Sequence, residues 1–153
     1  MSLPAHICLR SSGGDEPRPY KMIRIDHIGI ATNGIEEASA WWREALGLDF
    51  GETEEVAEQK VRVAKLSLGE SSIELLEPVS ADSPISKFLD KRGPGIHHIA
   101  VRVDDIRAEL AKMKEKGARL IDEQPRTGAG GCLVAFVHPS STGGVLLELV
   151  QKV

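Results

Sequence analysis

Two histidines occupy matching places in two similar apolar segments. His27 lies within residues 25–31 and His98 within residues 96–103, and they are 71 positions apart (98 − 27). Both segments are rich in isoleucine, valine and alanine, which favours β-strands. Each is followed by a polar helix start. The spacing therefore predicts two strands, each carrying one imidazole at the same place in a repeated unit.

Two glutamates form a second matched pair. Glu74 and Glu148 both stand between aliphatic residues of later strands, one in each repeat. Burying a carboxylate among leucines is costly unless it is paired or bound to a cation. Imidazole nitrogen together with carboxylate oxygen suits a divalent first-row metal. The repeat therefore predicts a metal site with four ligands: His27, Glu74, His98 and Glu148.

The elements that must position these residues form two βαβββ units. The first spans about residues 23–78 and the second about 95–151, within one domain of residues 22–153. Gly47 is expected to end one helix and Gly117 another. The expected N-caps are Thr32 or Asn33, Asp82 or Ser83, and Asp104 or Asp105. Strands are expected at 23–31, 48–56, 61–68 and 72–77, and again at 96–103, 118–122, 132–138 and 144–150, so the fold class is α+β.

Composition and net charge limit the classes of protein to which this chain can belong. The 153 residues are 41% hydrophobic and 27% charged, which is typical of a globular domain, and the net charge of −4 argues against nucleic acid as a partner. No apolar run approaches the roughly 18 residues that span a bilayer. Cys8 and Cys132 form no CxxC pair, so two free thiols and a cytoplasmic location are expected. Residues 1–21 are expected to be a disordered extension or a non-native remnant.

Several blocks of sequence together resemble the methylmalonyl-CoA epimerase family. They are the two histidine segments, residues 73–78, the helix start at 82–85 and the run at 143–149. That family belongs to the vicinal oxygen chelate superfamily, of which glyoxalase I is another member. The resemblance covers residues 25–151. It implies a curved, partly open β-barrel-like sheet around a metal site, and a homodimer.

The resemblance also implies a reaction and roles for residues. The family's metal ligands fall on His27, Glu74, His98 and Glu148, and the metal is cobalt, nickel, manganese or zinc. Strand alternation would point His97 away from the metal, as a packing or supporting residue. The reaction is epimerisation of (R)- and (S)-methylmalonyl-CoA by removal and return of the α-proton. Glu148 would be the base on one face.

One position departs from the family pattern. Several bacterial members carry a glutamate on the third strand, where this chain has Val63. The second acid/base is therefore open between Glu58 and Glu74, with a bound water as a further possibility. Four basic residues are candidates for binding the phosphates of an acyl-CoA: Lys65, Lys87, Arg92 and Arg126.

Two alternatives stay open at this point. One is another enzyme of the same superfamily, such as glyoxalase I (lactoylglutathione lyase), which uses a similar set of histidines and glutamates. The other is a non-catalytic module that binds or sequesters a small molecule. Such a module would not need all four ligand positions filled.

Overall fold

The structure is a computed structural model that describes residues 23–153. The predicted extension at 1–21, including Cys8, lies outside the described residues. The elements, in chain order, are β1 (Arg24–Ala31), α1 (Ile35–Leu46), β2 (Phe50–Val56), η1 (Ala57–Gln59), β3 (Val61–Leu68), β4 (Ser71–Pro78), α2 (Pro84–Arg92), β5 (Gly95–Arg102), α3 (Ile106–Glu115), β6 (Arg126–Thr127), η2 (Ala129–Gly131), β7 (Leu133–Val137), η3 (Pro139–Ser141) and β8 (Leu147–Gln151).

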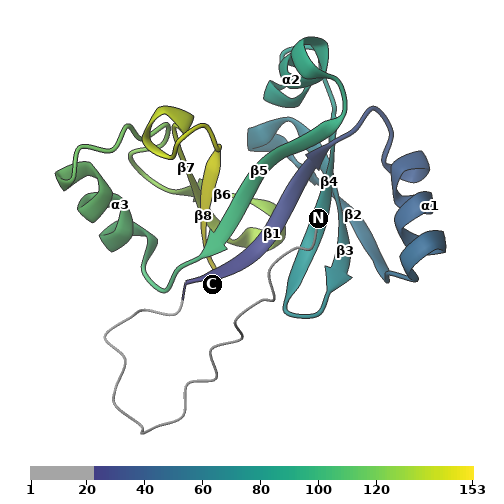
Figure 1. The fold of residues 1–153 in the computed structure, drawn as a ribbon, viewed down its shortest axis with the longest axis horizontal. Coiled ribbons are helices and arrows are strands. Elements are labelled where there is room, and N and C mark those ends of the chain that lie inside the picture. The colour runs from purple at the N-terminus through teal and green to yellow at the C-terminus, as the bar shows by residue number, and fades with distance from the viewer. Residues whose placement is uncertain (1–22) are drawn as a thin grey trace, which may run out of the picture.

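All eight strands belong to one sheet in the order β2-β3-β4-β1-β5-β8-β7-β6. The two histidine strands, β1 and β5, are antiparallel neighbours at its centre. The last strand of each unit pairs in parallel with its own first strand, β4 with β1 and β8 with β5. Figure 1 shows the sheet curling around this centre, with α1 and α3 at opposite ends. The predicted α+β fold of two βαβββ units is confirmed.

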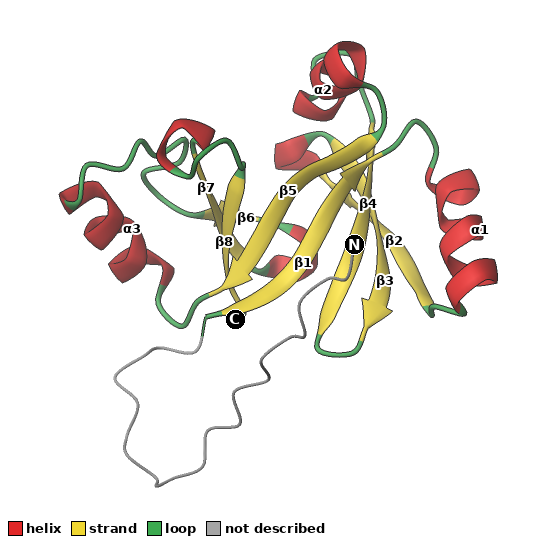
Figure 2. Ribbon diagram, viewed as in Figure 1, coloured by secondary structure: helices red, strands yellow, loops and turns green. Residues whose placement is uncertain are grey.

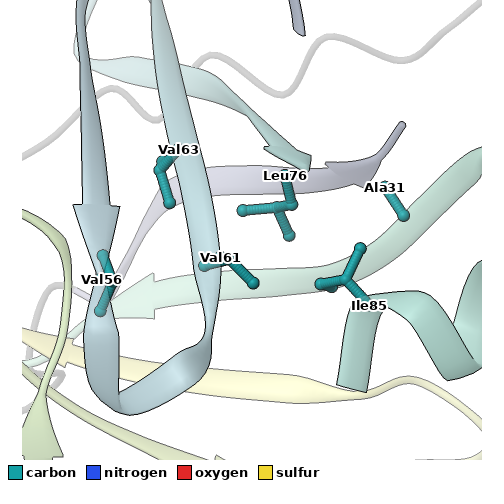
Figure 3. Packing of buried hydrophobic residues seen from close by; sticks show 6 residues of the cluster. All are labelled: Ala31, Val56, Val61, Val63, Leu76 and Ile85. Carbon is teal, nitrogen blue, oxygen red and sulfur yellow. The ribbon is translucent and has the colours of Figure 1, made fainter. Parts of the chain in front are cut away.

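Side chains alternate between the concave and the outer face of the sheet. On β4, Ile73 and Leu75 pack outward into a cluster with Ile35 of α1. Glu74 stands between them and therefore points to the concave face. The concave face also holds an apolar cluster, drawn in Figure 3: Ala31, Val56, Val61, Val63, Leu76 and Ile85. The outward clusters fix the strands, and alternation then aims the polar residues inward.

The helices lie at the periphery of the strands, as Figure 2 shows. Gly47 ends α1 with φ of 64°, as predicted. Ser83 caps α2 and Asp105 caps α3, both within the predicted choices. The predicted cap of α1 at Thr32 or Asn33 is wrong. Gly34 is the N-cap, and the Thr32 hydroxyl accepts a hydrogen bond from its N–H at 3.2 Å.

The predicted strand at 118–122 is also wrong. In this segment Leu120 makes one isolated bridge with Val137. The carboxylate of Asp122 accepts the N–H of Phe136 at 2.9 Å, where a regular ladder would use a backbone carbonyl. Backbone bonds from the Ile121 N–H to the Phe136 carbonyl and from the His138 N–H to the Arg119 carbonyl are present, but they do not continue into a ladder. The strand of the second unit forms later, as the two-residue β6.

The edges of the curled sheet approach each other across the concave side. Glu54, on the edge strand β2, accepts a hydrogen bond at 2.8 Å from the N–H of Gly130 in η2. This contact joins the first unit to the second and partly closes the barrel. Within residues 23–153, no helix has the length and apolar character needed to cross a membrane.

Candidate active site and metal centre

The four predicted ligand residues come from four adjacent strands at the centre of the sheet. The His27 Nε2 atom lies 3.0 Å from His98 Nε2 and 3.1 Å from Glu148 Oε2. His98 Nε2 lies 2.8 Å from the same glutamate oxygen. Glu74 Oε2 lies 3.3 Å from His27 Nε2. Three residues therefore form a tight group, and Glu74 joins it through His27.

This cluster fits a divalent metal. Ligands at right angles around an ion with bonds of about 2.1 Å lie about 3 Å apart, which matches the separations of 2.8–3.3 Å found here. His27, His98 and Glu148 are each 4–5% exposed. A carboxylate buried as deeply as that of Glu148 needs positive charge beside it, and the Glu74 side chain is only 12% exposed. The donor set of nitrogen and oxygen atoms is one that first-row metals accept.

Burial, hydrogen bonds and neighbouring charges shift the pKa values of the cluster residues. Burial alone would lower the pKa of His27, but hydrogen bonds to Asp26 and Glu148 and the charge of Glu74 raise it to about 10. Burial would raise the pKa of Glu148, but its hydrogen bond with His27 and its close contact with His98 lower it to about 2. Burial raises the pKa of Glu74 above its ordinary value.

Asp26 is a site residue that the sequence reasoning missed. Its Oδ2 accepts a hydrogen bond from His27 Nδ1 at 2.8 Å. Its Oδ1 accepts from Arg102 Nη2 at 2.9 Å and Nε at 3.0 Å, and lies 3.3 Å from Lys152 Nζ. Burial would raise the pKa of Asp26, but its hydrogen bonds from His27 and Arg102 hold it far below its usual range. The sequence signal was its place directly before His27.

His97 does not line the cluster cavity, and its contacts with His98 and Phe88 fit the expected packing or supporting role. The expectation that strand alternation separates the His97 and His98 rings is wrong. The two Nδ1 atoms lie 2.9 Å apart, and the rings meet edge to face. An irregularity in the strand places both rings on one side. Burial lowers the pKa of His97 to about 4, and the nearby His98 and Arg92 act in the same direction. At neutral pH this imidazole is therefore uncharged.

Three cavities meet at His98, which lines all of them. The largest, about 730 Å³, lies between α2, β5 and the turn before β8. A second of about 190 Å³ includes Glu58 and Arg126 in its wall. The smallest, about 30 Å³, contains the cluster itself and is also lined by Val63. His98 therefore separates the cluster from the two larger cavities and lines all three.

The predicted substrate-binding cations are distributed unevenly over these cavities. Lys87 and Arg92 are exposed on α2 and line the largest, together with Lys91. Arg126 lines the second, but its Nε lies 3.0 Å from the Asp122 carboxylate, so its charge is already paired. Lys65 is exposed on β3, opposite Glu74 in register, and lines none of the three.

Gly29 on β1 leaves the space that the His98 ring fills. A Cβ at this position would lie 2.2–2.7 Å from three ring atoms of His98. No side chain other than hydrogen fits there while the imidazole keeps its place. The backbone of Gly29 does not have a positive φ, so the requirement is for space alone.

We expect Gly29→Ala to displace the His98 ring and lower the affinity for a divalent metal by at least about tenfold, because one ligand leaves the cluster. Titration of the metal-free protein with Zn²⁺ measures this. Gly95→Ala, on the neighbouring strand with open space at its Cβ, is the matched control. Equal affinities of the two variants would contradict the prediction.

Comparisons with known proteins show the family to which the chain belongs. Residues 26–136 match the Glyoxalase/Bleomycin resistance protein/Dioxygenase superfamily. The mitochondrial methylmalonyl-CoA epimerase of Bos taurus is 40% identical over 133 residues, which is 86% of this chain and 76% of the relative. The ethylmalonyl-CoA/methylmalonyl-CoA epimerase of Cereibacter sphaeroides is 40% identical over 130 residues, 84% of this chain and 97% of the relative.

A solved structure gives the same result in three dimensions. A methylmalonyl-CoA epimerase in complex with methylmalonyl-CoA and NH4+ superposes with a TM-score of 0.81 at 40% identity, covering 84% of this chain and 94% of that one. Both the sequence and the curled eight-stranded sheet thus lead to one assignment. The chain belongs to the methylmalonyl-CoA epimerase family of the glyoxalase/bleomycin resistance protein/dioxygenase superfamily.

Proposed function

We propose that this protein is a metal-dependent epimerase that interconverts the (R) and (S) forms of methylmalonyl-CoA. The observation that carries the proposal is the buried cluster of His27, His98 and Glu148, with Glu74 beside it, and with His98 also lining a cavity of about 730 Å³. Relatives at 40% identity are named for this reaction. For that reason the glyoxalase I alternative is not favoured.

His27, Glu74, His98 and Glu148 are the ligands we assign. A cobalt, nickel, manganese or zinc ion held there would supply positive charge beside the carboxylate and thioester oxygens of the substrate. The protein side chains determine which ligand atoms face the metal position. His27 and His98 present Nε2 to the cluster, and burial of the cluster excludes bulk water.

Glu148 is the base we assign to one face of the substrate. Its contacts with both histidines use Oε2, so Oε1 is the oxygen we assign to the α-proton. Its lowered pKa keeps it ionised at neutral pH. The electron pair of the broken C–H bond moves onto the thioester oxygen. Return of a proton to the opposite face of the carbon inverts the centre.

Glu58 is the residue we assign to that opposite face. Val63 lines the cluster cavity at the place where the resemblance implies a glutamate, but a valine cannot transfer a proton. Glu74 lies 3.3 Å from His27 within the cluster. Glu58 is exposed in η1, in the wall of the cavity that also contains His98. This arrangement favours Glu58 over Glu74.

The exposed cations of α2 are the residues we assign to the substrate's phosphates. Lys87, Lys91 and Arg92 line the largest cavity. The guanidinium of Arg92 also lies 5.7 Å from the ring centroid of Phe88, which restrains it. We therefore propose that an acyl-CoA enters past α2, with its thioester end directed to His98. A homodimer and a cytoplasmic location remain parts of this proposal that measurements of mass in solution and of cell fractions would test.

The proposed reaction predicts incorporation of solvent deuterium. Incubated with methylmalonyl-CoA and Co²⁺ in deuterated water, the protein should incorporate deuterium at the α-carbon far faster than Co²⁺ alone. Glu148→Gln should lower the rate by at least about 10²-fold, because the base is lost. NMR or mass spectrometry of the substrate measures the exchange. A wild-type rate equal to that of the metal alone would refute the proposal.

Replacing the second acid/base should separate exchange from inversion. We expect Glu58→Gln to slow epimerisation by about 10²-fold or more while Glu148 still exchanges the proton on its own face. Metal content should stay at the wild-type level. Glu55→Gln, a carboxylate on the outer part of β2, is the matched control. If Glu74→Gln gave this split instead, with metal retained, the second role would belong to Glu74.

Metal affinity should rise with pH. The pKa of His27 is raised to about 10, so the metal-free cluster holds a proton at neutral pH that a metal must displace. Release of one proton predicts an affinity that rises about tenfold per pH unit between about pH 6 and pH 9. Calorimetry in two buffers with different ionisation enthalpies measures the protons released. A pH-independent affinity would contradict the assignment of His27 as a ligand.

A further inference from the structure

Each histidine strand contains a β-bulge, and both bulges lie in the β1–β5 pairing. On β1, Ile25 and His27 pair with consecutive residues of β5, so Asp26 is the extra residue. On β5, Ile96 and His98 pair with consecutive residues of β1, so His97 is the extra residue. The extra residue therefore directly precedes the cluster histidine in both repeats.

A bulge changes the direction of the side chains on its strand. Without it, Asp26 and His27 would point to opposite faces, as would His97 and His98. With it, each extra side chain reaches the ring that follows. Asp26 Oδ2 lies 2.8 Å from His27 Nδ1, and His97 Nδ1 lies 2.9 Å from His98 Nδ1. The two contacts are equivalent within the repeat.

Both contacts are made to the ring nitrogen that does not face the cluster. The cluster side of each ring is Nε2, and these two atoms lie 3.0 Å apart. A neutral imidazole carries its proton on one nitrogen and a lone pair on the other. An acceptor held at Nδ1 therefore keeps the proton there and leaves the lone pair of Nε2 for a metal.

We propose that the bulged residues Asp26 and His97 are positioning residues that fix the tautomer and the orientation of His27 and His98. This inference rests on the metal site of the proposed function. Because His98 donates from Nδ1 to Nδ1 of His97, His97 carries its own proton on Nε2. The bulges make this possible because they bring each acceptor to the Nδ1 atom of the following histidine.

The two supports differ in charge and in their surroundings. Asp26 is an anion, buried and held by Arg102 and Lys152. His97 is an uncharged ring whose centroid lies 5.1 Å from that of Phe88, and it lines the two larger cavities. His27 is thus supported from the closed interior of the sheet. His98 is supported by a ring that faces the proposed substrate path.

Substitutions of His97 separate hydrogen bonding from packing. Asparagine places a carbonyl oxygen near the position of Nδ1, whereas leucine has a similar shape and no acceptor. We expect His97→Leu to lower the affinity for Zn²⁺ by about 10- to 100-fold, and His97→Asn to stay within about threefold of the wild type. Asp26→Asn should also lose about 10- to 100-fold. Isothermal titration of the metal-free proteins with Zn²⁺ measures each value.

Two further measurements make the result specific. Thermal unfolding of each metal-free variant shows whether it folds, and Glu70→Gln, an exposed carboxylate in a turn, is the control for loss of charge. Nitrogen-15 NMR of the histidine rings reports the tautomer directly. We expect His98 to be protonated at Nδ1 in the wild type and in His97→Asn, and to lose this preference in His97→Leu.

Equal losses of affinity in His97→Leu and His97→Asn, with both folded, would overturn the proposal, because packing alone would then explain the effect. Unchanged affinity in both His97→Leu and Asp26→Asn would overturn it as well. The NMR measurement separates this inference from the proposed function. A wild type that bound no Zn²⁺ but showed the expected His98 tautomer would refute the metal site and leave the positioning intact.

Discussion

The burial of two histidines and two glutamates at the centre of one sheet is the constraint on which the rest of this structure depends. Each buried carboxylate costs several kcal/mol unless opposite charge or hydrogen bonds compensate it. Here the compensation is mutual. Glu148 accepts from His27 and lies 2.8 Å from His98 Nε2, and Asp26 is in turn balanced by Arg102 and Lys152. In the metal-free state the proton on His27 completes the balance, in the place that a divalent ion would take.

The repeated βαβββ unit supplies these four buried residues in two equivalent pairs. One unit supplies one histidine and one glutamate, from a first and a last strand that pair in parallel. Antiparallel pairing of β1 with β5 brings the two halves of the site face to face. Outward apolar clusters under α1 and α3 hold the strands in register, so the polar residues are fixed by packing on the opposite face.

The site is symmetric in its ligands but not in its surroundings. On one side α2 and the turn before β8 leave a cavity of about 730 Å³ that reaches His97 and His98. On the other side His27 is enclosed with Asp26 inside the sheet. One substrate bound from one direction requires this asymmetry. Val63 lines the cluster cavity but has no group that can transfer a proton. A second acid/base must therefore come from another residue.

The sequence by itself determined the repeat, the α+β fold, the four residues of the cluster and most helix ends. These follow from local rules, namely strand periodicity, capping residues, glycine at helix ends, and the cost of a glutamate between aliphatic residues. The tertiary structure decided what depends on pairing between distant segments. Register shifts of one residue in β1–β5 place Asp26 and His97 beside the rings, and no local pattern marks a bulge. The need for glycine at position 29 exists only because a ring from another strand fills that space. The strand expected at 118–122 failed because this segment makes only an isolated bridge with β7, and the Asp122 side chain takes the N–H of Phe136 that a ladder would use.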